Sequence, residues 1–350
     1  MEGTFGLRSR KAEHVGFGCR ERGVGVNRSS VAVTTVLAVA VVVITSCTVA
    51  RTGATAPPAA AVSAAKVDLS FRIDSATASS AASVVQRLHV LNGDTTYDGP
   101  LAVTYVTAMY VNIDRTKPLP AGCGMHLADT DPTIPEVVTC RRQVRLKPKQ
   151  EVTLDIPLTV TPQARFAGRT RGLAMAAPAA DSGVVDTNLS DNWDYAQLRV
   201  LPPTPPTPSG SPIDLYLTYD VPALSENKPT AVDFHYSRTG PGHTVSGVRF
   251  TFVTPFYVNH HGVLSPGCRM RLTDSDPLVP EIVTCSLPPL SPGATRAVSV
   301  PLTLLQNAPY GPIGGLALVA PAAVDGGAAA VETWQIDNFL PVTMVNISTP

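Results

Sequence analysis

The feature that most constrains the fold is an internal repeat. Segments of two copies match in the same order along the chain: residues 104–112 (TYVTAMYVN) with 251–259 (TFVTPFYVN), 123–140 (CGMHLADTDPTIPEVVTC) with 268–285 (CRMRLTDSDPLVPEIVTC), 157–160 (PLTV) with 301–304 (PLTL), and 172–178 (GLAMAAP) with 315–321 (GLALVAP). The offset between copies varies by only a few residues, so the insertions are small. The pattern indicates a tandem duplication of one domain of about 135 residues, a common domain size.

The segments between and before the copies set the domain boundaries. The stretch 202–212 (PPTPPTPSGSP) is rich in proline and predicts an extended, semi-rigid linker. We therefore expect the first repeat at 67–201 and the second at 213–350. Residues 47–66 are rich in Ala, Thr and Pro and predict a flexible tether.

Each repeat predicts β-structure. Apolar and polar residues alternate strictly at 67–73 (VDLSFRI) and 213–219 (IDLYLTY), and again around Val232–Tyr236 and Val248–Phe252. A period of two places one face of a strand on a core and the other in water. Short runs of this kind, broken by Pro, Gly, Asn and Asp, are typical of an all-β sandwich. We expect two tandem Ig-like antiparallel β-sandwich domains of about seven strands each.

The N-terminal segment predicts export. Residues 31–46 (VAVTTVLAVAVVVITS) are apolar and uncharged, and six basic residues precede them. A basic region followed by an apolar region is the pattern of an export signal, and this run is shorter than the roughly 20 residues that span a bilayer. We expect residues 1–46 to be a signal peptide. The length of the basic region leaves open a true start nearer Val24 or Val26.

The residues Ile44-Thr45-Ser46-Cys47 resemble the lipobox of bacterial lipoproteins. That resemblance implies cleavage after Ser46 and a lipid on Cys47, which places the chain on the outer face of the cytoplasmic membrane in a bacterial cell envelope. Two alternatives stay open: a plain secretory signal with an incidental cysteine, and an uncleaved anchor helix.

The motifs of the two repeats resemble a known family. The second repeat carries Pro266-Gly267-Cys268, Val283-Thr284-Cys285 and Leu290-Ser291-Pro292-Gly293, and the first carries Ala121-Gly122-Cys123, Val138-Thr139-Cys140 and an Asn92-Gly93 turn. This order resembles the Ig-like repeats of bacterial surface proteins, including CARDB-type adhesion modules. The resemblance implies a sandwich fold and surface exposure, and it transfers no catalytic residues.

The cysteines predict disulfides. Each repeat holds one pair with the same spacing, so we expect the bridges Cys123–Cys140 and Cys268–Cys285, as suits an exported protein. Each would contribute roughly 3 kcal/mol by closing its loop. Cys47 is left over, as a lipidated residue should be. A zinc site is disfavoured because the chain has no CxxC pair.

The polar motif that recurs inside the disulfide loops has two interpretations. Its carboxylates are Asp129, Asp131 and Glu136 in the first repeat and Asp274, Asp276 and Glu281 in the second. Such oxygens are ligands that calcium prefers. The alternative is a turn, in which Asp bonds its own backbone and Pro fixes the next φ. The turn is favoured because no EF-hand spacing or glycine accompanies the motif, so calcium is the weaker expectation and no other cofactor is predicted.

One dense positive run breaks the repeat symmetry. It comprises Arg141, Arg142, Arg145 and Lys147, and the second repeat has no counterpart. It predicts either a solvated strand face or a patch for an anionic partner in the envelope. His89, His126 and His235 are expected to be surface groups, and His260-His261 is not expected to chelate a metal.

Charge and motifs narrow the function. Lys and Arg number 27 and Asp and Glu number 27, which excludes a strongly basic nucleic-acid binder. The chain has no G-x-S-x-G, no H-E-x-x-H and no phosphate loop, so we expect no enzyme. We expect a non-enzymatic adhesion, binding or stalk module that meets an unknown envelope protein or polymer. The alternatives are an accessory subunit of an envelope enzyme or transporter, and a signal-anchored membrane protein of the same fold.

Overall fold

The structure is a computed structural model that describes residues 65–162, 164, 169–201, 212–226, 228–239, 244–322, 331–332 and 338–347. The predicted signal segment, Cys47 and most of the predicted linker lie outside these residues. Both repeats belong to one compact unit, residues 61–350. In the described ranges, no helix has the length and apolar character needed to cross a membrane.

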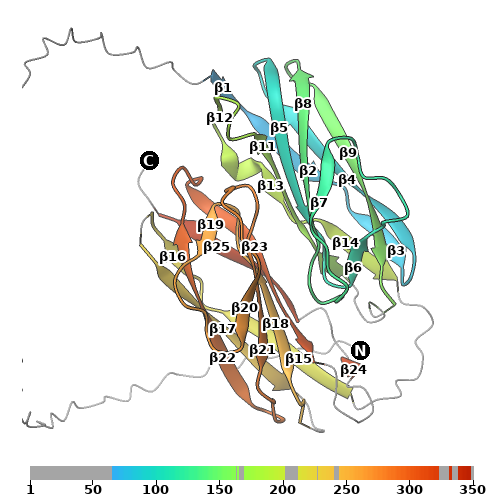
Figure 1. Ribbon diagram of the computed structural model, residues 1–350, viewed down its shortest axis with the longest axis vertical. Helices are drawn as coiled ribbons and strands as arrows, with labels where there is room; N and C mark the ends of the chain where they lie inside the picture. The colour runs from blue at the N-terminus through green and yellow to red at the C-terminus, as the bar shows by residue number, and fades with distance from the viewer. Residues whose placement is uncertain are drawn as a thin grey trace, which may run out of the picture. The chain divides into compact units, whose positions relative to one another are not determined.

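The first repeat is a β-sandwich (Figure 1). Its elements are β1 (Ala65–Val67), β2 (Leu69–Ile73), β3 (Ala76–Ser79), β4 (Ser83–Asn92), β5 (Tyr97–Val106), β6 (Val111–Ile113), β7 (Cys123–Leu127), β8 (Val137–Leu146), β9 (Glu151–Val160), β10 (Arg169–Arg171), β11 (Leu173–Pro178), β12 (Val184–Asp186), the 3-10 turn η2 (Leu189–Asp191), β13 (Trp193–Asp194) and β14 (Gln197–Leu201). One sheet has the order β2-β4-β9-β6 and the other β13-β11-β5-β8-β7. The strands β10-β14-β3 and the pair β1-β12 complete the domain.

The second repeat has the same plan. Its strands are β15 (Pro212–Tyr219), β16 (Ala223–Leu224), β17 (Thr230–Thr239), β18 (Val248–Val253), β19 (Val258–His260), β20 (Cys268–Leu272), β21 (Ile282–Leu287), β22 (Thr295–Leu304), β23 (Gly311–Pro321), β24 (Val331–Glu332) and β25 (Phe339–Asn346). One sheet runs β19-β22-β17-β15-β24 and the other β16-β25-β23-β18-β21-β20. Four strands of each sheet correspond between the repeats, β2-β4-β9-β6 to β15-β17-β22-β19 and β11-β5-β8-β7 to β23-β18-β21-β20. The predicted fold class, two tandem Ig-like β-sandwiches, is confirmed.

The alternation seen in the sequence forms the cores. On β2, Leu69 and Phe71 are buried while Arg72 is exposed. In the second sandwich the ring of Phe234 lies 5.0 Å from that of Phe250 and 4.9 Å from that of Phe252, between the two sheets. Rings at such separations contribute beyond the area that they bury. The period-two pattern therefore selects the face that each strand turns to the core.

Both predicted disulfides are confirmed. Cys123 on β7 lies opposite Cys140 on β8, with 3.8 Å between their Cα atoms. Cys268 on β20 lies opposite Cys285 on β21, at 3.9 Å. Because β7 and β20 are the edge strands of their sheets, each bridge fastens an edge strand to its neighbour.

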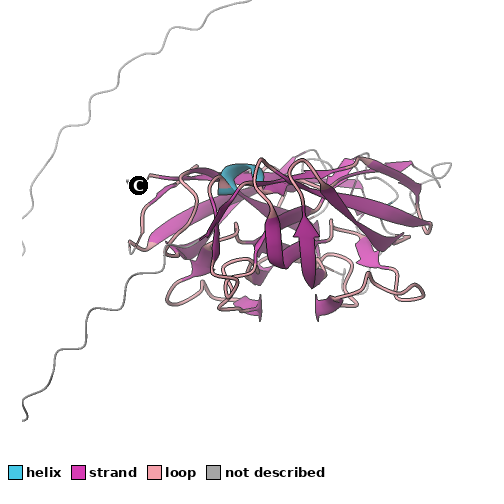
Figure 2. Ribbon diagram, turned by 90° about the horizontal axis from the view of Figure 1, so that it is seen from above, coloured by secondary structure: helices cyan, strands magenta, loops and turns pink. Residues whose placement is uncertain are grey.

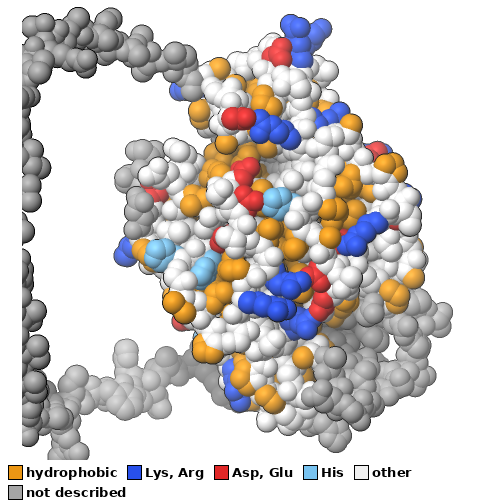
Figure 3. All heavy atoms as spheres, viewed as in Figure 1, with side chains coloured by type: hydrophobic (Ala, Val, Ile, Leu, Met, Phe, Trp, Pro, Cys, Tyr) orange, Lys and Arg blue, Asp and Glu red, His pale blue; other side chains and the backbone are white. Residues whose placement is uncertain are grey.

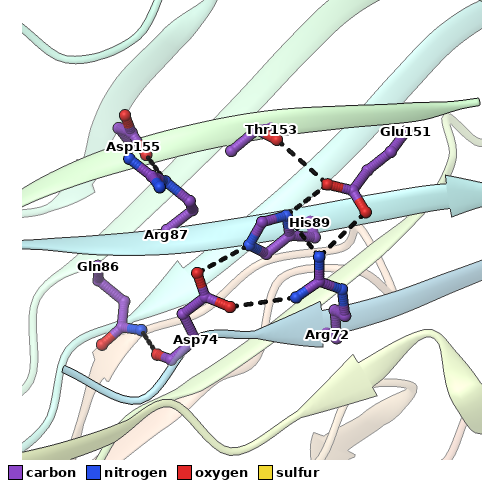
Figure 4. Close-up of polar contacts among 8 residues, drawn as sticks. All are labelled: Arg72, Asp74, Gln86, Arg87, His89, Glu151, Thr153 and Asp155. Carbon is purple, nitrogen blue, oxygen red and sulfur yellow. Dashed lines mark hydrogen bonds and ion pairs between the residues drawn. The ribbon is translucent and has the colours of Figure 1, made fainter.

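The outer face of β2, β4 and β9 carries a polar cluster around His89 (Figure 4). The expectation that His89 is a surface group is wrong, because the residue is only 7% exposed. Its ring lies between two carboxylates, with Nε2 3.0 Å from Oδ2 of Asp74 and Nδ1 2.6 Å from Oε1 of Glu151. The hydrogen bond from His89 lowers the pKa of both carboxyl groups. Arg72 pairs with the same two carboxylates, and its Nη2 lies 3.2 Å from Nδ1 of His89.

Candidate binding interface between the two repeats

The two sandwiches share a continuous apolar contact. Residues of the second repeat, among them Phe256, Leu278, Val279 and Leu316, belong to the same buried cluster as the core of the first repeat. Figure 1 shows the two sandwiches next to each other, and Figure 2 shows that the described part of the chain consists almost entirely of strands and loops. Leu316 lies on β23 of the disulfide-bearing sheet, Phe256 follows β18, and Leu278 and Val279 lie in the loop between β20 and β21. The sites predicted inside the disulfide loops therefore meet at the junction.

An aromatic pair anchors the junction at one end. Trp193 on β13 and Tyr195 beside it pack edge to face, with their ring centroids 5.4 Å apart. The Tyr195 hydroxyl donates to the carbonyl oxygens of Gly315 and Val342 in the second sandwich, at 3.2 and 3.4 Å, and burial raises its pKa. A Cβ atom at Gly314 would lie 2.8 Å from Cε3 of Trp193, so only glycine leaves room for the indole ring.

The carboxylates of the DxDP loops form turns. Oδ1 of Asp129 accepts the N–H of Asp131 at 2.9 Å, and Oδ1 of Asp131 accepts the N–H of Thr133 at 3.0 Å. In the second repeat, Asp274 accepts from the N–H of Asp276 at 2.7 Å and Asp276 from that of Leu278 at 2.9 Å. These are the bonds expected of the turn interpretation. Among the described residues, no three His, Cys, Asp or Glu side chains are grouped to hold a metal ion.

A buried glutamate closes each loop from beneath. Glu136 is fully buried and accepts the N–H of Ile113 at 2.6 Å and that of Asp129 at 3.3 Å. It also pairs with the guanidinium of Arg115. Its counterpart Glu281 accepts the N–H of His260, and burial raises the pKa of its carboxyl group.

The second oxygens of the loop carboxylates reach across the junction. Asp129 pairs through Oδ2 with Arg271 on β20, and Asp131 pairs through Oδ2 with Arg249 on β18. In the opposite direction, Oδ2 of Asp274 lies 2.7 Å from Nε2 of His126 on β7. The aligned motifs make Asp274 the counterpart of Asp129, and His126 the counterpart of Arg271. The contact is therefore built as in a twofold dimer, with each repeat offering the same patch.

This symmetry produces two related clefts. The one that we call the filled cleft has a volume of about 370 Å³ and is lined by Asp129, Asp131, Ile134, Arg249, Gly267, Arg269, Arg271, Thr284, Cys285 and Ser286. The other, which we call the open cleft, has a volume of about 670 Å³. Its lining contains the counterpart of each of these ten residues. In the same order they are Asp274, Asp276, Val279, Ala102, Gly122, Gly124, His126, Thr139, Cys140 and Arg141.

The cleft floors have the same backbone. Gly122 and Gly267 both adopt positive φ, at 80° and 83°. A Cβ atom at Gly267 would lie 2.6 Å from the carbonyl oxygen of Ser286, so glycine is required there by both φ and space. The clefts therefore differ in side chains: Arg249, Arg269 and Arg271 correspond to Ala102, Gly124 and His126.

The predicted basic patch lies on β8. Arg141, Arg145 and Lys147 are exposed, and Arg142 is half-buried. Arg141 pairs with Asp181, whose hydrogen bond raises the pKa of the guanidinium, and Nε of Arg145 lies 3.6 Å from Asp98. Because part of its charge is neutralised within the chain, the patch's role toward an anionic partner stays a prediction. Figure 3 shows basic side chains interspersed with acidic ones on the face that it displays.

The basic side chains at the junction, Arg249, Arg271 and His126, are not among the site residues predicted from the sequence. Arg249 belongs to a strand predicted from alternation, Arg271 lies inside the recurring cysteine motif, and His126 is predicted to be a surface group. The available signal was a mismatch: these positions differ in charge between copies inside motifs that otherwise match. Such a difference marks where two related surfaces have diverged.

No family model and no curated protein matches the chain. Among solved structures it is similar to the third ScaC cohesin of Acetivibrio cellulolyticus, with 11% identity, a TM-score of 0.24, and coverage of 39% of this chain and 98% of that one. It is also similar to a cohesin of OlpC from Clostridium thermocellum, with 11% identity, a TM-score of 0.25, and coverage of 39% of this chain and 97% of that one. For alpha-2-macroglobulin of E. coli the identity is 11% and the TM-score 0.21, with coverage of 81% of this chain and 17% of that one. Likenesses this distant support no function, and the CARDB resemblance stays a prediction.

Proposed function

We propose that the protein is an exported lipoprotein, anchored through Cys47 to the outer face of the cytoplasmic membrane, whose paired sandwiches form a non-enzymatic protein-binding module. The observation that carries the proposal is the pair of disulfides, one per repeat. Structural disulfides persist in oxidising compartments outside the cytoplasm. The apolar run and the lipobox-like residues before Cys47 supply the route to that compartment.

The junction supports a binding role over that of a plain spacer. A spacer needs only that its domains follow one another, whereas here the two sandwiches bury a common apolar cluster and make polar side-chain contacts in both directions. A rigid pair of domains holds its loops and clefts in fixed positions, which reduces the entropy lost on binding. The first described strand begins at Ala65, and the segment between it and Cys47 is the predicted tether to the membrane.

The test is the intact mass of the protein taken from its native membrane, before and after reduction and alkylation. The proposal predicts a chain that begins at Cys47 and carries lipid, with four alkylated thiols that appear only after reduction. A mass that includes residues before Cys47 would instead indicate a signal-anchored protein. Thiols that alkylate without reduction would refute export.

A further inference from the structure

We infer that the open cleft binds the guanidinium group of an arginine side chain that a partner protein presents. The inference deepens the proposed binding role and rests on it. It comes from comparing two clefts that correspond residue by residue through the duplication but differ in the basic side chains that line them. The filled cleft shows what these carboxylates bind when a ligand is supplied by the chain itself.

The filled cleft is the internal precedent. Its two loop carboxylates each use one oxygen for a turn bond and the other for a guanidinium, Asp129 for Arg271 and Asp131 for Arg249. Arg249 also donates to Oγ1 of Thr133 at 3.4 Å. Arginine suits this role because its planar group stays charged and donates several parallel hydrogen bonds to carboxylates.

The open cleft keeps the acceptors and lacks two of the cations. Asp276, the counterpart of Asp131, makes its turn bond through Oδ1 and has no ion pair among the described residues. The counterpart of Arg249 is Ala102, which offers no charge. Asp274 is still paired, with His126. Asp276 therefore lacks the cationic partner that its counterpart Asp131 has in Arg249.

Space is available where the arginines are missing. The open cleft has about 670 Å³ against about 370 Å³ for its twin. Ala102 and Gly124 leave room where Arg249 and Arg269 stand, and Leu278 and Val279 provide an apolar wall for the methylene groups of an incoming side chain. The cleft therefore fits a long side chain with an apolar stem and a cationic head.

The charge of the lining agrees with a cationic ligand. Three carboxylates, Asp181, Asp274 and Asp276, face one guanidinium, Arg141, and one imidazole, His126. Arg141 is bound by Asp181 through both carboxylate oxygens, and Asp276 acts on its guanidinium only as a weaker charge without a hydrogen bond. The filled cleft has the opposite balance, two carboxylates and three arginines. A positive side chain is attracted to the open cleft and repelled by its twin.

The experiment is a methyl NMR titration of the purified full chain, with its disulfides intact. The probe is the blocked tripeptide acetyl-Gly-Arg-Gly-amide, and the control replaces its arginine with citrulline, which has nearly the same shape and no charge. Methyl groups of Leu278 and Val279 report on the open cleft, and that of Ile134 reports on the filled one. We expect saturable shifts at Leu278 and Val279 with the arginine peptide and at least tenfold weaker binding of the citrulline peptide.

Three variants make the assignment specific. Asp276→Asn should weaken binding at least fivefold, and Ala102→Arg should abolish it by supplying the missing guanidinium from within. Arg269→Gly, a matched change at the filled cleft, should leave the titration unchanged. The folding of each variant is checked by its methyl spectrum without peptide.

Three results would overturn the inference: no shift at Leu278 and Val279, equal binding of the citrulline peptide, or an unchanged affinity in Asp276→Asn. The titration does not depend on lipid at Cys47. Binding by a chain whose native mass shows no export would therefore refute the proposed location alone, whereas a lipidated, exported chain that ignores the peptide would refute this inference alone.

Discussion

Replacing the two buried loop glutamates by glutamine should have very different costs. Glu136 accepts two backbone N–H groups through different oxygens and pairs with Arg115. Either orientation of a glutamine amide at this position turns one acceptor into a donor that faces another donor. The change loses at least one hydrogen bond to a charged group and leaves a buried N–H unpaired. We expect Glu136→Gln to lower the free energy of unfolding by about 2–4 kcal/mol.

Glu281 is the matched control because its surroundings lack the cation. The position that corresponds to Arg115 is Gly262, and the carboxylate accepts one backbone N–H, that of His260. A glutamine can turn its oxygen toward that N–H and keep the bond. We expect Glu281→Gln to cost less than about 1 kcal/mol at neutral pH.

The pH dependence of Glu281→Gln separates the two cases further. Burial raises the pKa of Glu281 above its ordinary value of 4.5. Folding therefore favours the protonated form, and the stability this group contributes is present below that value and lost as pH rises through the folded-state pKa. The stability of Glu281→Gln relative to the parent protein should therefore increase as the pH rises through the folded-state pKa of Glu281.

The assay is urea unfolding of the full chain followed by circular dichroism, with the disulfides intact, at pH 4 and pH 8. Differences in the midpoint at constant slope report the change in stability. Equal costs for the two substitutions would refute the reasoning, because Glu136 accepts two backbone N–H groups and pairs with a cation, whereas Glu281 accepts one N–H and has no such cation. A Glu281→Gln difference that does not vary with pH would refute the effect of burial on that carboxyl group.

Three further predictions concern the junction, the bridges and the polar cluster. Gly314→Val should force the Trp193 ring from its place and cost about 1–3 kcal/mol, seen as a lower melting temperature and a changed tryptophan emission. The control is Gly124→Val, where a Cβ atom meets nothing within 4 Å and φ is not positive. Replacing Cys123 and Cys140 together by alanine should cost about 3 kcal/mol in urea unfolding, and no loss would contradict the stapling role. His89→Gln should destabilise the protein at pH 7, and this difference in stability should shrink as the pH falls below about 4. The two flanking carboxyl groups have lowered pKa values, so the stability that they contribute is present above their ordinary pKa values and is lost as they protonate. A difference that is constant from pH 7 to pH 3 would contradict this.

The sandwiches and their bridges could be predicted because the evidence for them is local and appears twice. Alternation at 67–73 and 213–219 reports one face of one strand, and a pair of cysteines per copy allows one bridge per copy. The turn interpretation of the DxDP loops rests on the same local chemistry. Each of these features involves residues near one another in the chain.

The burial of His89 and the junction could not be predicted in this way. His89 lies on the outer face of β4 and is covered by side chains from β2 and β9 and by Asp74. Arg271 and Asp129 are 142 residues apart in the chain and meet only because the two repeats pack against each other. Both depend on long-range packing, which a periodic pattern does not report.

The most direct test of the account is a crystal structure of the full chain with acetyl-Gly-Arg-Gly-amide. The account predicts both clefts at one junction, Arg249 and Arg271 on their carboxylates, and guanidinium density on Asp276 in the open cleft. An empty cleft in which Arg141 has left Asp181 and bonds Asp276 itself would contradict it, because the chain would then supply both cations and leave no place for a partner's arginine.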